Sequence, residues 1–364
     1  MNSQRLTPIA GSIYTSIAAI VVALVIGLVT YVLWGSGLFL TVAHEFDGQC
    51  RRVGGVVAGE DIVLHRDWQM AYLSSFTTRR SGIYAFDLND PDAVPVNLLP
   101  EDFGEFRSLG LSLWRNPNGS DRLFVVNRVP EPRIEIFELV GPLTLRHIQT
   151  VRSTLIRYPN DVAAVGFDQF YVTNTHRGEP GSWLRAAETY LRLQTGDVTF
   201  FDGERARVVV DGVGYANGIA ASNDGTQVYV ASTATSEVFR FDRDEQNELV
   251  LKDRTATPGR ADNIAVSPDS TITVALHPKA LDAAGYMGGG DGIAPTRIAQ
   301  IHFDPPRVDI IYDDPGTELS AGATGVLVGN RLLIGPVRAD YFLDCRANMG
   351  FYEFAVITAI TRSS

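Results

Sequence analysis

The sequence lacks the motifs of several common enzyme classes. It has no Gly-x-Ser-x-Gly elbow of the α/β-hydrolases and no Walker phosphate loop, and His44-Glu45 has no second histidine to complete a zinc-protease helix. Basic residues are in the minority, with 31 Lys and Arg against 42 Asp and Glu. Because a nucleic-acid partner needs a basic face, we expect no nucleic-acid binding. No feature of the sequence indicates an oligomeric state.

Charged residues are absent from a long stretch near the N-terminus. No Asp, Glu, Lys or Arg occurs over 6–43, and 17–34 is almost wholly apolar. As a helix, this apolar run would extend about 27 Å, close to the thickness of the hydrocarbon core of a bilayer. We therefore expect a membrane anchor, with a helix over about residues 13–36, in an N-terminal segment of residues 1–44. A cleaved signal peptide and a buried core helix are the alternatives.

Cysteine is scarce, and the two that occur, Cys50 and Cys345, lie near the ends of the remaining chain. A bond between them would join the two ends of a closed ring fold and would need an oxidising compartment; two unrelated buried thiols are the alternative. The sequon at Asn118 agrees with glycosylation outside the cytoplasm. Basic residues on the two sides of the apolar segment nearly balance. The cysteines therefore decide our expectation of a single-pass membrane protein with its main domain outside the cytoplasm.

Long helical patterns are nearly absent after the apolar segment, where 182–193 is the best candidate for a short helix. Short segments rich in Val, Ile, Phe and Tyr, such as 83–88 and 123–127, are instead bounded by Gly, Pro, Asn or Asp. This pattern predicts an all-β domain over residues 45–364, built as a sandwich, a barrel or a propeller.

An internal repeat favours the propeller. A strand, a tight polar turn and a second strand recur in 163–172, 219–230 and 264–274, at a spacing of about 50 residues that suits one propeller blade. The domain has room for about six such blades. We therefore predict a six-bladed β-propeller preceded by one N-terminal transmembrane helix.

Polar doublets stand directly before the three repeats. The doublets are Asn160-Asp161, Asn217-Gly218 and Asp262-Asn263. In a propeller, residues that lead into equivalent strands converge on the central tunnel, and Glu60-Asp61 would complete such a group. Carboxylate and amide oxygens are the ligands that calcium prefers. The alternative for each doublet is an Asx-type turn that bonds only its own backbone.

These residues resemble the paraoxonase/arylesterase family. The resemblance runs in the same order along nearly everything after residue 45, and it ends at the second cysteine. The segments that carry it are Gly59-Glu60-Asp61, 158–166, 170–176, 214–219, 224–231, 262–266 and His277-Pro278.

The resemblance implies two calcium ions in the tunnel of a six-bladed propeller. It implies that a catalytic calcium is held by Glu60, Asn160, Asn217, Asp262 and Asn263. It implies that a deeper structural calcium is held by Asp61, Asp161 and a main-chain carbonyl near Val129. It also implies a Cys50–Cys345 disulfide bond and a retained hydrophobic N-terminal segment.

The implied activity is calcium-dependent hydrolysis of carboxylic esters, aryl esters or lactones, in which water attacks a carbonyl polarised by the metal. The family uses a histidine pair as the base. Arg128 stands at the first position of that pair and His147 at the second, while His176 and His277 match other family histidines. Arg128 cannot act as a base at neutral pH. We expect it to bind an anionic group of the substrate or to stabilise the oxyanion.

Two other interpretations remain open from the sequence. One is a propeller enzyme similar to gluconolactonase or strictosidine synthase. The other is a non-catalytic propeller scaffold tethered to a membrane, which the loss of a family histidine at Arg128 supports. The glycine-rich run 288–292 is expected to form a mobile loop or a lid over the tunnel mouth.

Overall fold

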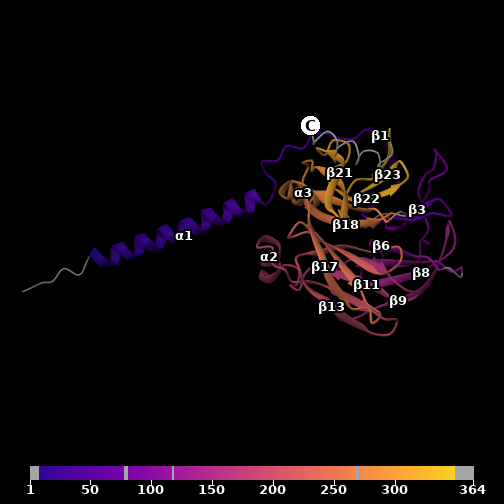
Figure 1. The fold of residues 1–364 in the computed structure, drawn as a ribbon, viewed down its shortest axis with the longest axis horizontal. Coiled ribbons are helices and arrows are strands. Elements are labelled where there is room, and N and C mark those ends of the chain that lie inside the picture. The colour runs from indigo at the N-terminus through magenta and orange to yellow at the C-terminus, as the bar shows by residue number, and fades with distance from the viewer. Residues whose placement is uncertain (1–7, 78–80, 117–118, 268–269, 349–364) are drawn as a thin grey trace, which may run out of the picture.

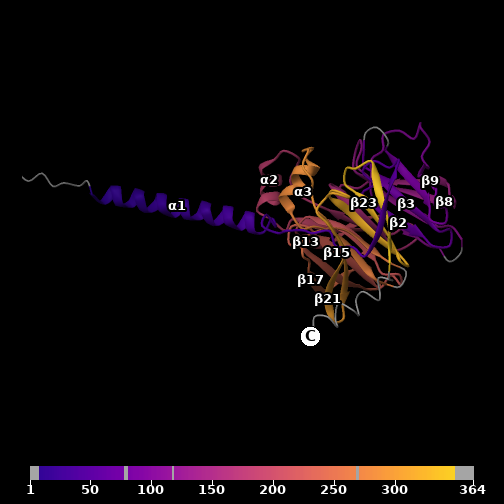
Figure 2. The ribbon, with the colours of Figure 1, turned by 90° about the horizontal axis from the view of Figure 1, so that it is seen from above.

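The structure is a computed structural model, and it describes residues 8–77, 81–116, 119–267 and 270–348. Within these residues, the strands form six four-stranded antiparallel sheets that follow one another along the chain (Figures 1 and 2). The domain is an all-β six-bladed propeller, which confirms the predicted fold. Asn118 of the predicted glycosylation site lies outside the described residues.

Each sheet runs from an inner strand beside the central axis to an outer strand. The first two sheets contain β2 (Ile62–His65), β3 (Met70–Ser75), β4 (Gly82–Asp87) and β5 (Val96–Asn97), then β6 (Ser108–Trp114), β7 (Arg122–Asn127), β8 (Arg133–Gly141) and β9 (Thr144–Val151). The next two contain β10 (Pro159–Ala164), β11 (Phe170–Asn174), β12 (Gly196–Phe201) and β13 (Ala206–Val213), then β14 (Ala216–Ala221), β15 (Gln227–Ser232), β16 (Glu237–Arg243) and β17 (Leu249–Ala256). The last two contain β18 (Arg260–Val266), β19 (Ile272–His277), β20 (Thr296–Phe303) and β21 (Pro306–Asp314), then β22 (Gly322–Val328), β23 (Arg331–Pro336), β24 (Tyr341–Ala347) and β1 (Gly48–Gly54).

Each sheet buries its two faces against the neighbouring sheets. Six hydrophobic clusters fill the spaces between adjacent sheets, including the space between the last sheet and the first. In that closing space Phe86 contacts Phe342, with ring centroids 5.1 Å apart. Strands β3 and β7 are buried at every residue, which is why their sequences lack the alternation of a half-exposed strand.

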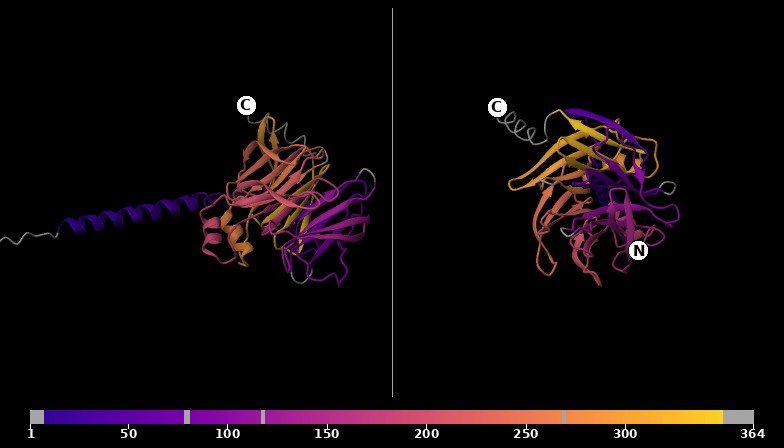
Figure 3. Two further views of the ribbon diagram at one scale, coloured as in Figure 1. Left: turned by 90° about the horizontal axis from the view of Figure 1, so that it is seen from below. Right: turned by 90° about the vertical axis from the view of Figure 1, so that its right-hand side faces the viewer.

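The first and last strands of the domain close the ring. Strand β1 pairs antiparallel with β24, and Cys50 lies directly opposite Cys345. The two cysteines form a disulfide bond, as the family resemblance implies. In Figure 3 (right), the yellow strands from the end of the chain lie beside the indigo and violet strands from its beginning. This pairing covers the open edge that the last sheet would otherwise present to solvent.

Helix α1 (Pro8–Trp34) precedes the propeller and stands clear of it (Figure 1; Figure 3, left). Its segment Tyr14–Tyr31 has a mean hydropathy of 2.1 and buries none of its length inside the protein. The helix is therefore long and apolar enough to cross a membrane, and it is not a buried core helix. A signal sequence has the same properties.

The end of α1 meets the propeller beside two short helices, α2 (Trp183–Tyr190) and α3 (Ala280–Met287), as Figure 2 shows. The backbone amide of Ala280 donates to the carbonyl of Ser36 (2.8 Å). The predicted short helix at 182–193 is confirmed as α2, whereas α3 is not anticipated by the sequence. The glycine-rich run 288–292 follows α3 directly.

Candidate functional site

The inner strands β10, β14 and β18 each contain a β-bulge. In each of them, two residues fall between positions that pair with the next strand. These residues are Asn160-Asp161, Asn217-Gly218 and Asp262-Asn263. Each doublet lies inside its strand, so the predicted position directly before the strand is wrong. A bulge redirects side chains that would otherwise follow the sheet faces, and here it brings polar side chains together at the axis.

We call the five side chains that converge here the tunnel cluster: Glu60, Asn160, Asn217, Asp262 and Asn263. Asn217 Nδ2 donates to Asp262 Oδ1 (2.7 Å), and Asn263 Nδ2 donates to the main-chain carbonyl of Glu60 (3.0 Å). The charge of Glu60 also acts on Asp161, the neighbour of Asn160. Hydrogen bonds therefore link Asn217 with Asp262 and Asn263 with Glu60, across three blades, and Asn160 occupies the equivalent bulge of a fourth blade.

Three amide oxygens of the tunnel cluster have no hydrogen-bond partner. Oδ1 of Asn160, Oδ1 of Asn217 and Oδ1 of Asn263 are all buried and unpaired. A buried polar atom without a partner costs about 1–3 kcal/mol, so three in one place require an explanation. A hard cation such as calcium binds neutral oxygens of this kind together with carboxylates. The donor set of the tunnel cluster therefore fits calcium.

The carboxyl group of Glu60 lies in a strongly perturbed electrostatic environment. Burial and the neighbouring charge of Asp262 raise its pKa to about 8, although Arg128 opposes the shift. A bound divalent cation would relieve the repulsion between the two carboxylates and favour their ionised forms.

A second pair of carboxylates, Asp61 and Asp161, uses the same hydrogen-bonding arrangement on two blades. Asp61 accepts from the amides of Ile62 (2.8 Å) and Leu111 (2.7 Å). Asp161 accepts from the amides of Val162 and Ile219. Each carboxylate therefore joins its own inner strand to the next one.

Burial is the main electrostatic influence on this pair. It raises the pKa of Asp61 to about 7 against the opposing effect of the backbone amides. Burial and then the charge of Asp61 raise the pKa of Asp161. Asp61 also lines a cavity of about 590 Å³ whose walls include residues from all six inner strands. This cavity is the part of the central tunnel on the side of Asp61, and no residue of the tunnel cluster is among its lining residues.

The resemblance implies a main-chain carbonyl near Val129 as a further ligand beside this pair. In the structure, the carbonyl of Val129 accepts a hydrogen bond from the guanidinium of Arg133. The backbone amide of Leu111 is the main-chain group that contacts Asp61 from the neighbouring strand. The sequence carries no signal for this contact except the small residue Gly110 before it.

Two glycines permit the close approach of neighbouring inner strands. A Cβ atom at Gly110 would lie 2.1 Å from Oδ1 of Asp161, and one at Gly218 would lie 2.6 Å from Cα of Asn263. No side chain fits at either position without displacing a residue of the site. The compact ring of carboxylates and amides therefore depends on these glycines.

Two of the predicted histidines lie at the site. His277 Nε2 is 2.8 Å from Oδ2 of Asp262, and its Nδ1 is buried without a partner. His176 packs edge-on against Tyr215, with ring centroids 4.7 Å apart, and its Nδ1 is also unpaired. Burial and the positive charge of Arg185 lower the pKa of His176 to about 4. The His176 imidazole is therefore neutral at neutral pH.

Arg128 and His147, the positions assigned to the family's histidine pair, lie far apart in the fold. Arg128 follows β7 and donates from Nε to the carbonyl of Pro159 (2.6 Å), directly before Asn160. His147 lies on β9, the outer strand of its blade, where Glu135 binds its Nε2 (2.9 Å) and 35% of its side chain is exposed. The structure therefore brings Arg128 to the tunnel cluster but leaves His147 at the periphery, in a structural hydrogen bond.

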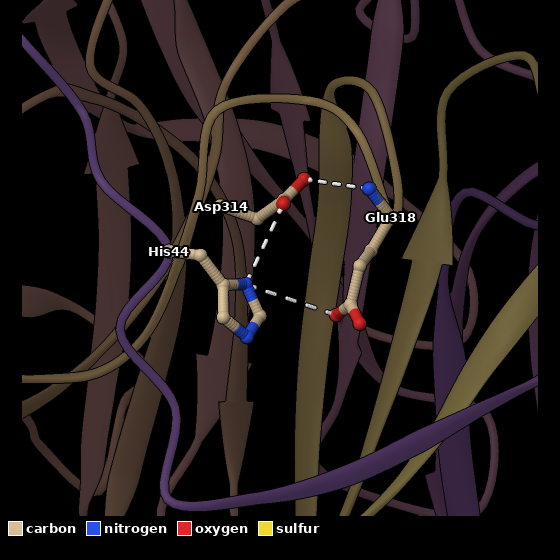
Figure 4. A group of neighbouring side chains, drawn as sticks. All are labelled: His44, Asp314 and Glu318. Carbon is tan, nitrogen blue, oxygen red and sulfur yellow. Dashed lines mark hydrogen bonds and ion pairs between the residues drawn. The ribbon is translucent and has the colours of Figure 1, made fainter.

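A further group of metal-ligating side chains lies away from the tunnel (Figure 4). We call His44, Asp314 and Glu318 the peripheral cluster, because Asp314 ends the outer strand β21. His44 Nδ1 is 3.6 Å from Oδ1 of Asp314 and 4.0 Å from Oε2 of Glu318. The sequence analysis did not anticipate this group, because its members are distant in the chain. It packs the segment after α1 against the propeller.

A six-bladed propeller with carboxylate and amide side chains in the bulges of its inner strands defines the class of this protein. The arylesterase family matches residues 56–345, and the chain belongs to that family. It is 30% identical to serum paraoxonase/arylesterase 1 of Rattus norvegicus over 277 residues, which cover 73% of this chain and 77% of that protein. It is 28% identical to the corresponding protein of Homo sapiens, and the match covers 79% of this chain and 86% of that protein. The resemblance found in the sequence is thus confirmed.

Solved structures of other propellers show the same fold at low identity. A putative gluconolactonase superposes with a TM-score of 0.53 and 17% identity, covering 86% of this chain and 96% of that one. Regucalcin of Agrobacterium tumefaciens, described as a calcium-binding protein, superposes with a TM-score of 0.51 and 13% identity. The match covers 85% of this chain and 96% of that one.

Proposed function

We propose that this protein hydrolyses carboxylic esters or lactones with the help of calcium held by the tunnel cluster. The observation that carries the proposal is the set of three buried, unpaired amide oxygens beside Glu60 and Asp262. Family membership supports the reaction class, because the relatives are paraoxonases and arylesterases by name. A propeller named as a putative gluconolactonase agrees with a lactone as an alternative substrate.

The proposed ligands of a catalytic calcium are the five members of the tunnel cluster. A bound calcium would polarise the carbonyl of the substrate and stabilise the oxyanion formed when water adds. Asn160, Asn217 and Asn263 present oxygens that need no deprotonation, whereas Glu60 must lose its proton to serve as a ligand. Asp61 and Asp161 would hold a second, structural ion.

We assign proton transfer to His277. Asp262 binds its Nε2, which fixes the tautomer that leaves Nδ1 free to accept a proton from water. His176 is a weak base, because burial and the charge of Arg185 lower its pKa to about 4. We therefore assign His176 to substrate positioning together with Tyr215, and we assign no catalytic role to His147.

Helix α1 would hold the enzyme on a membrane as a single-pass anchor. A disulfide bond between β1 and β24 supports a domain outside the cytoplasm, because such bonds persist in oxidising compartments. N-terminal sequencing of the protein isolated from its native membrane tests retention of the helix: a first residue after Trp34 would show a cleaved signal sequence instead.

The test of the activity uses the full chain in detergent with phenyl acetate and an aliphatic lactone. We expect hydrolysis of at least one substrate, complete loss on chelation, and recovery when calcium is restored. Activity that persists after chelation would contradict the calcium mechanism. Calcium binding without hydrolysis of any ester or lactone would favour a non-catalytic scaffold, the function that Arg128 at a family histidine position supports.

A further inference from the structure

The guanidinium of Arg128 is held beside the tunnel cluster without a carboxylate partner. Its Nε donates to the carbonyl of Pro159, and its central carbon lies 5.9 Å from the ring centroid of Phe76. The pKa of Arg128 falls because of burial, while Glu60 acts in the opposite direction. No carboxylate of the described residues lies within 4.0 Å of its nitrogens.

A second arginine, Arg185 on α2, lies near Arg128 and likewise has no carboxylate partner among the described residues. Its guanidinium stacks over Tyr158 at 4.6 Å from the ring centroid, and its Nη1 is buried with no hydrogen-bond partner. Among the described residues it forms no ion pair. Helix α2 is fixed at its first turn, where Ser182 Oγ accepts from the amide of Arg185 (3.1 Å).

The two arginines are close enough to act on each other and on the same histidine. The charge of Arg185 opposes the protonated form of Arg128, and both arginines help to lower the pKa of His176. By contrast, the buried arginines Arg133, Arg297 and Arg331 each contact a carboxylate at 2.5–2.6 Å. Arg128 and Arg185 are half-buried, and two neighbouring cations without an ion-pair partner repel each other, so an anionic ligand between them would be stabilising.

We propose that Arg128 and Arg185 bind a carboxylate group of the substrate, so that the enzyme selects esters or lactones that carry one. The selectivity rests on the proposed hydrolytic function, whereas the anion site itself does not. Guanidinium groups match the planar carboxylate and bind it more strongly than a neutral isostere. One divalent cation would balance Glu60 and Asp262, which leaves the charge of both arginines for the ligand. A local cationic site would attract an anionic substrate to a protein whose formal net charge is −11.

Arg185→Gln is the decisive variant, because Arg185 contacts no residue of the tunnel cluster in the structure. Arg177→Gln is the matched control, since Arg177 is half-exposed and pairs with Asp211 (2.6 Å) on the surface. Arg128→Gln is a second test, read together with calcium affinity, because Arg128 also holds the carbonyl of Pro159.

The first measurement is binding of benzoate and of its neutral isostere benzamide to the full chain with calcium, by calorimetry. We expect benzoate to bind at least about tenfold more tightly than benzamide, because a hydrogen bond to a charged group contributes about 1.5–3 kcal/mol. Arg185→Gln should remove this preference and Arg177→Gln should keep it. Equal affinity for both probes would overturn the proposal, as would unchanged benzoate binding in Arg185→Gln, which would assign benzoate to calcium alone.

The second measurement compares 5-oxotetrahydrofuran-2-carboxylate, a lactone acid, with its carboxamide. We expect Arg185→Gln to lower kcat/KM for the acid by about 10–100-fold and for the amide by less than about twofold. Equal losses for both lactones would show a merely structural role and overturn the proposal. Arginine-dependent benzoate binding without hydrolysis of either lactone would contradict the proposed hydrolase and leave the anion site supported.

Discussion

Two clusters of potential metal ligands in this protein differ in whether their oxygens accept hydrogen bonds from other protein groups. In the peripheral cluster, Asp314 accepts from the amides of Gly316, Glu318 and Leu319 and from the Thr317 hydroxyl (Figure 4). Oε2 of Glu318 likewise accepts from the Tyr312 hydroxyl (3.0 Å). In the tunnel cluster, three amide oxygens have no hydrogen-bond partner among the described residues.

The difference teaches that proximity of acidic residues alone does not identify a metal site. Carboxylates in both places accept hydrogen bonds from the protein, as Asp61 and Asp262 do in the tunnel, so the unpaired amide oxygens make the difference. His44 beside the peripheral carboxylates also has 44% of its side chain exposed. The peripheral carboxylates organise a turn and hold the segment after α1. The tunnel cluster instead keeps unpaired acceptors in a buried place, where an unpaired acceptor is unfavourable. We expect a cation to bind there and not at the periphery.

The largest expected effect is on calcium affinity. Asn160→Ala removes one unpaired oxygen of the tunnel cluster and should weaken calcium binding about 100-fold, at least as much as the loss of an outer-shell partner of a metal ligand. Glu318→Gln in the peripheral cluster should change it less than about twofold. Calorimetric titration of the two variants against the unmodified chain measures both. A larger loss in Glu318→Gln would reverse the assignment of the two clusters.

Removal of calcium should lower the melting temperature substantially. A ligand at about 1,000 times its dissociation constant stabilises the folded state by about 4 kcal/mol, which corresponds to roughly 8 °C for a domain of this size. The same decrease should occur in His44→Ala, because the peripheral cluster does not bind the ion. Melting curves with and without calcium test this. If removal of calcium no longer lowers the melting temperature of His44→Ala, the conclusion that the peripheral cluster does not bind the ion is wrong.

The calcium-free protein should become less stable as the pH rises from about 5 to 8. The pKa values of Glu60 and Asp61 are about 8 and about 7 in the folded state, above the 4.5 and 3.8 of ordinary carboxyl groups. In this range the folded state holds protons that the unfolded state has lost, so stability falls with rising pH.

We expect the melting temperature of protein dialysed free of calcium to fall by on the order of 5 °C between pH 5.5 and 8. Glu60→Gln should make the melting temperature fall less steeply with pH, whereas Glu318→Gln should leave this pH dependence unchanged. A melting temperature that increases over this range would show that the carboxyl groups are not protonated in the folded state.

The smallest expected effect tests the packing of the tunnel. Gly110→Ala places a Cβ atom against Asp161, so it should destabilise the protein by about 1–3 kcal/mol. Gly285→Ala in α3 meets no atom within 4 Å and should stabilise by about 0.5–1 kcal/mol as a helix substitution. Urea unfolding measures both. Equal stability of the two variants would show that the approach of β6 to Asp161 is not tight.

Much of the fold was predictable because it depends on local pattern. The apolar run specified a helix, and repeated strand–turn–strand segments specified blades of a propeller. The tunnel cluster was anticipated because equivalent positions in a repeat occupy equivalent places around its axis. The family resemblance assigned ligands to those positions, and hydrogen bonds join Asn217 to Asp262 and Asn263 to the carbonyl of Glu60.

The errors fall where contacts depend on register and on distant parts of the chain. The bulges that contain Asn160 and Asn217 arise from pairing with β11 and β15, which the doublets themselves do not reveal. His147 was a candidate base until the structure placed it on an outer strand. The unpaired state of Arg185 depends on how α2 packs, which no local pattern specifies.

By itself, the sequence determined the apolar helix, the six blades and the identity of the oxygen-bearing side chains, because periodicity and residue chemistry are properties of the chain. Only the tertiary structure decided which of these side chains meet and which are left without partners. The physical reason is that hydrogen-bond satisfaction is a property of the assembled ring. Asn160 and Asp314 are both polar residues in strands, but only packing leaves an oxygen of Asn160 unpaired in the tunnel while surrounding Asp314 with donors.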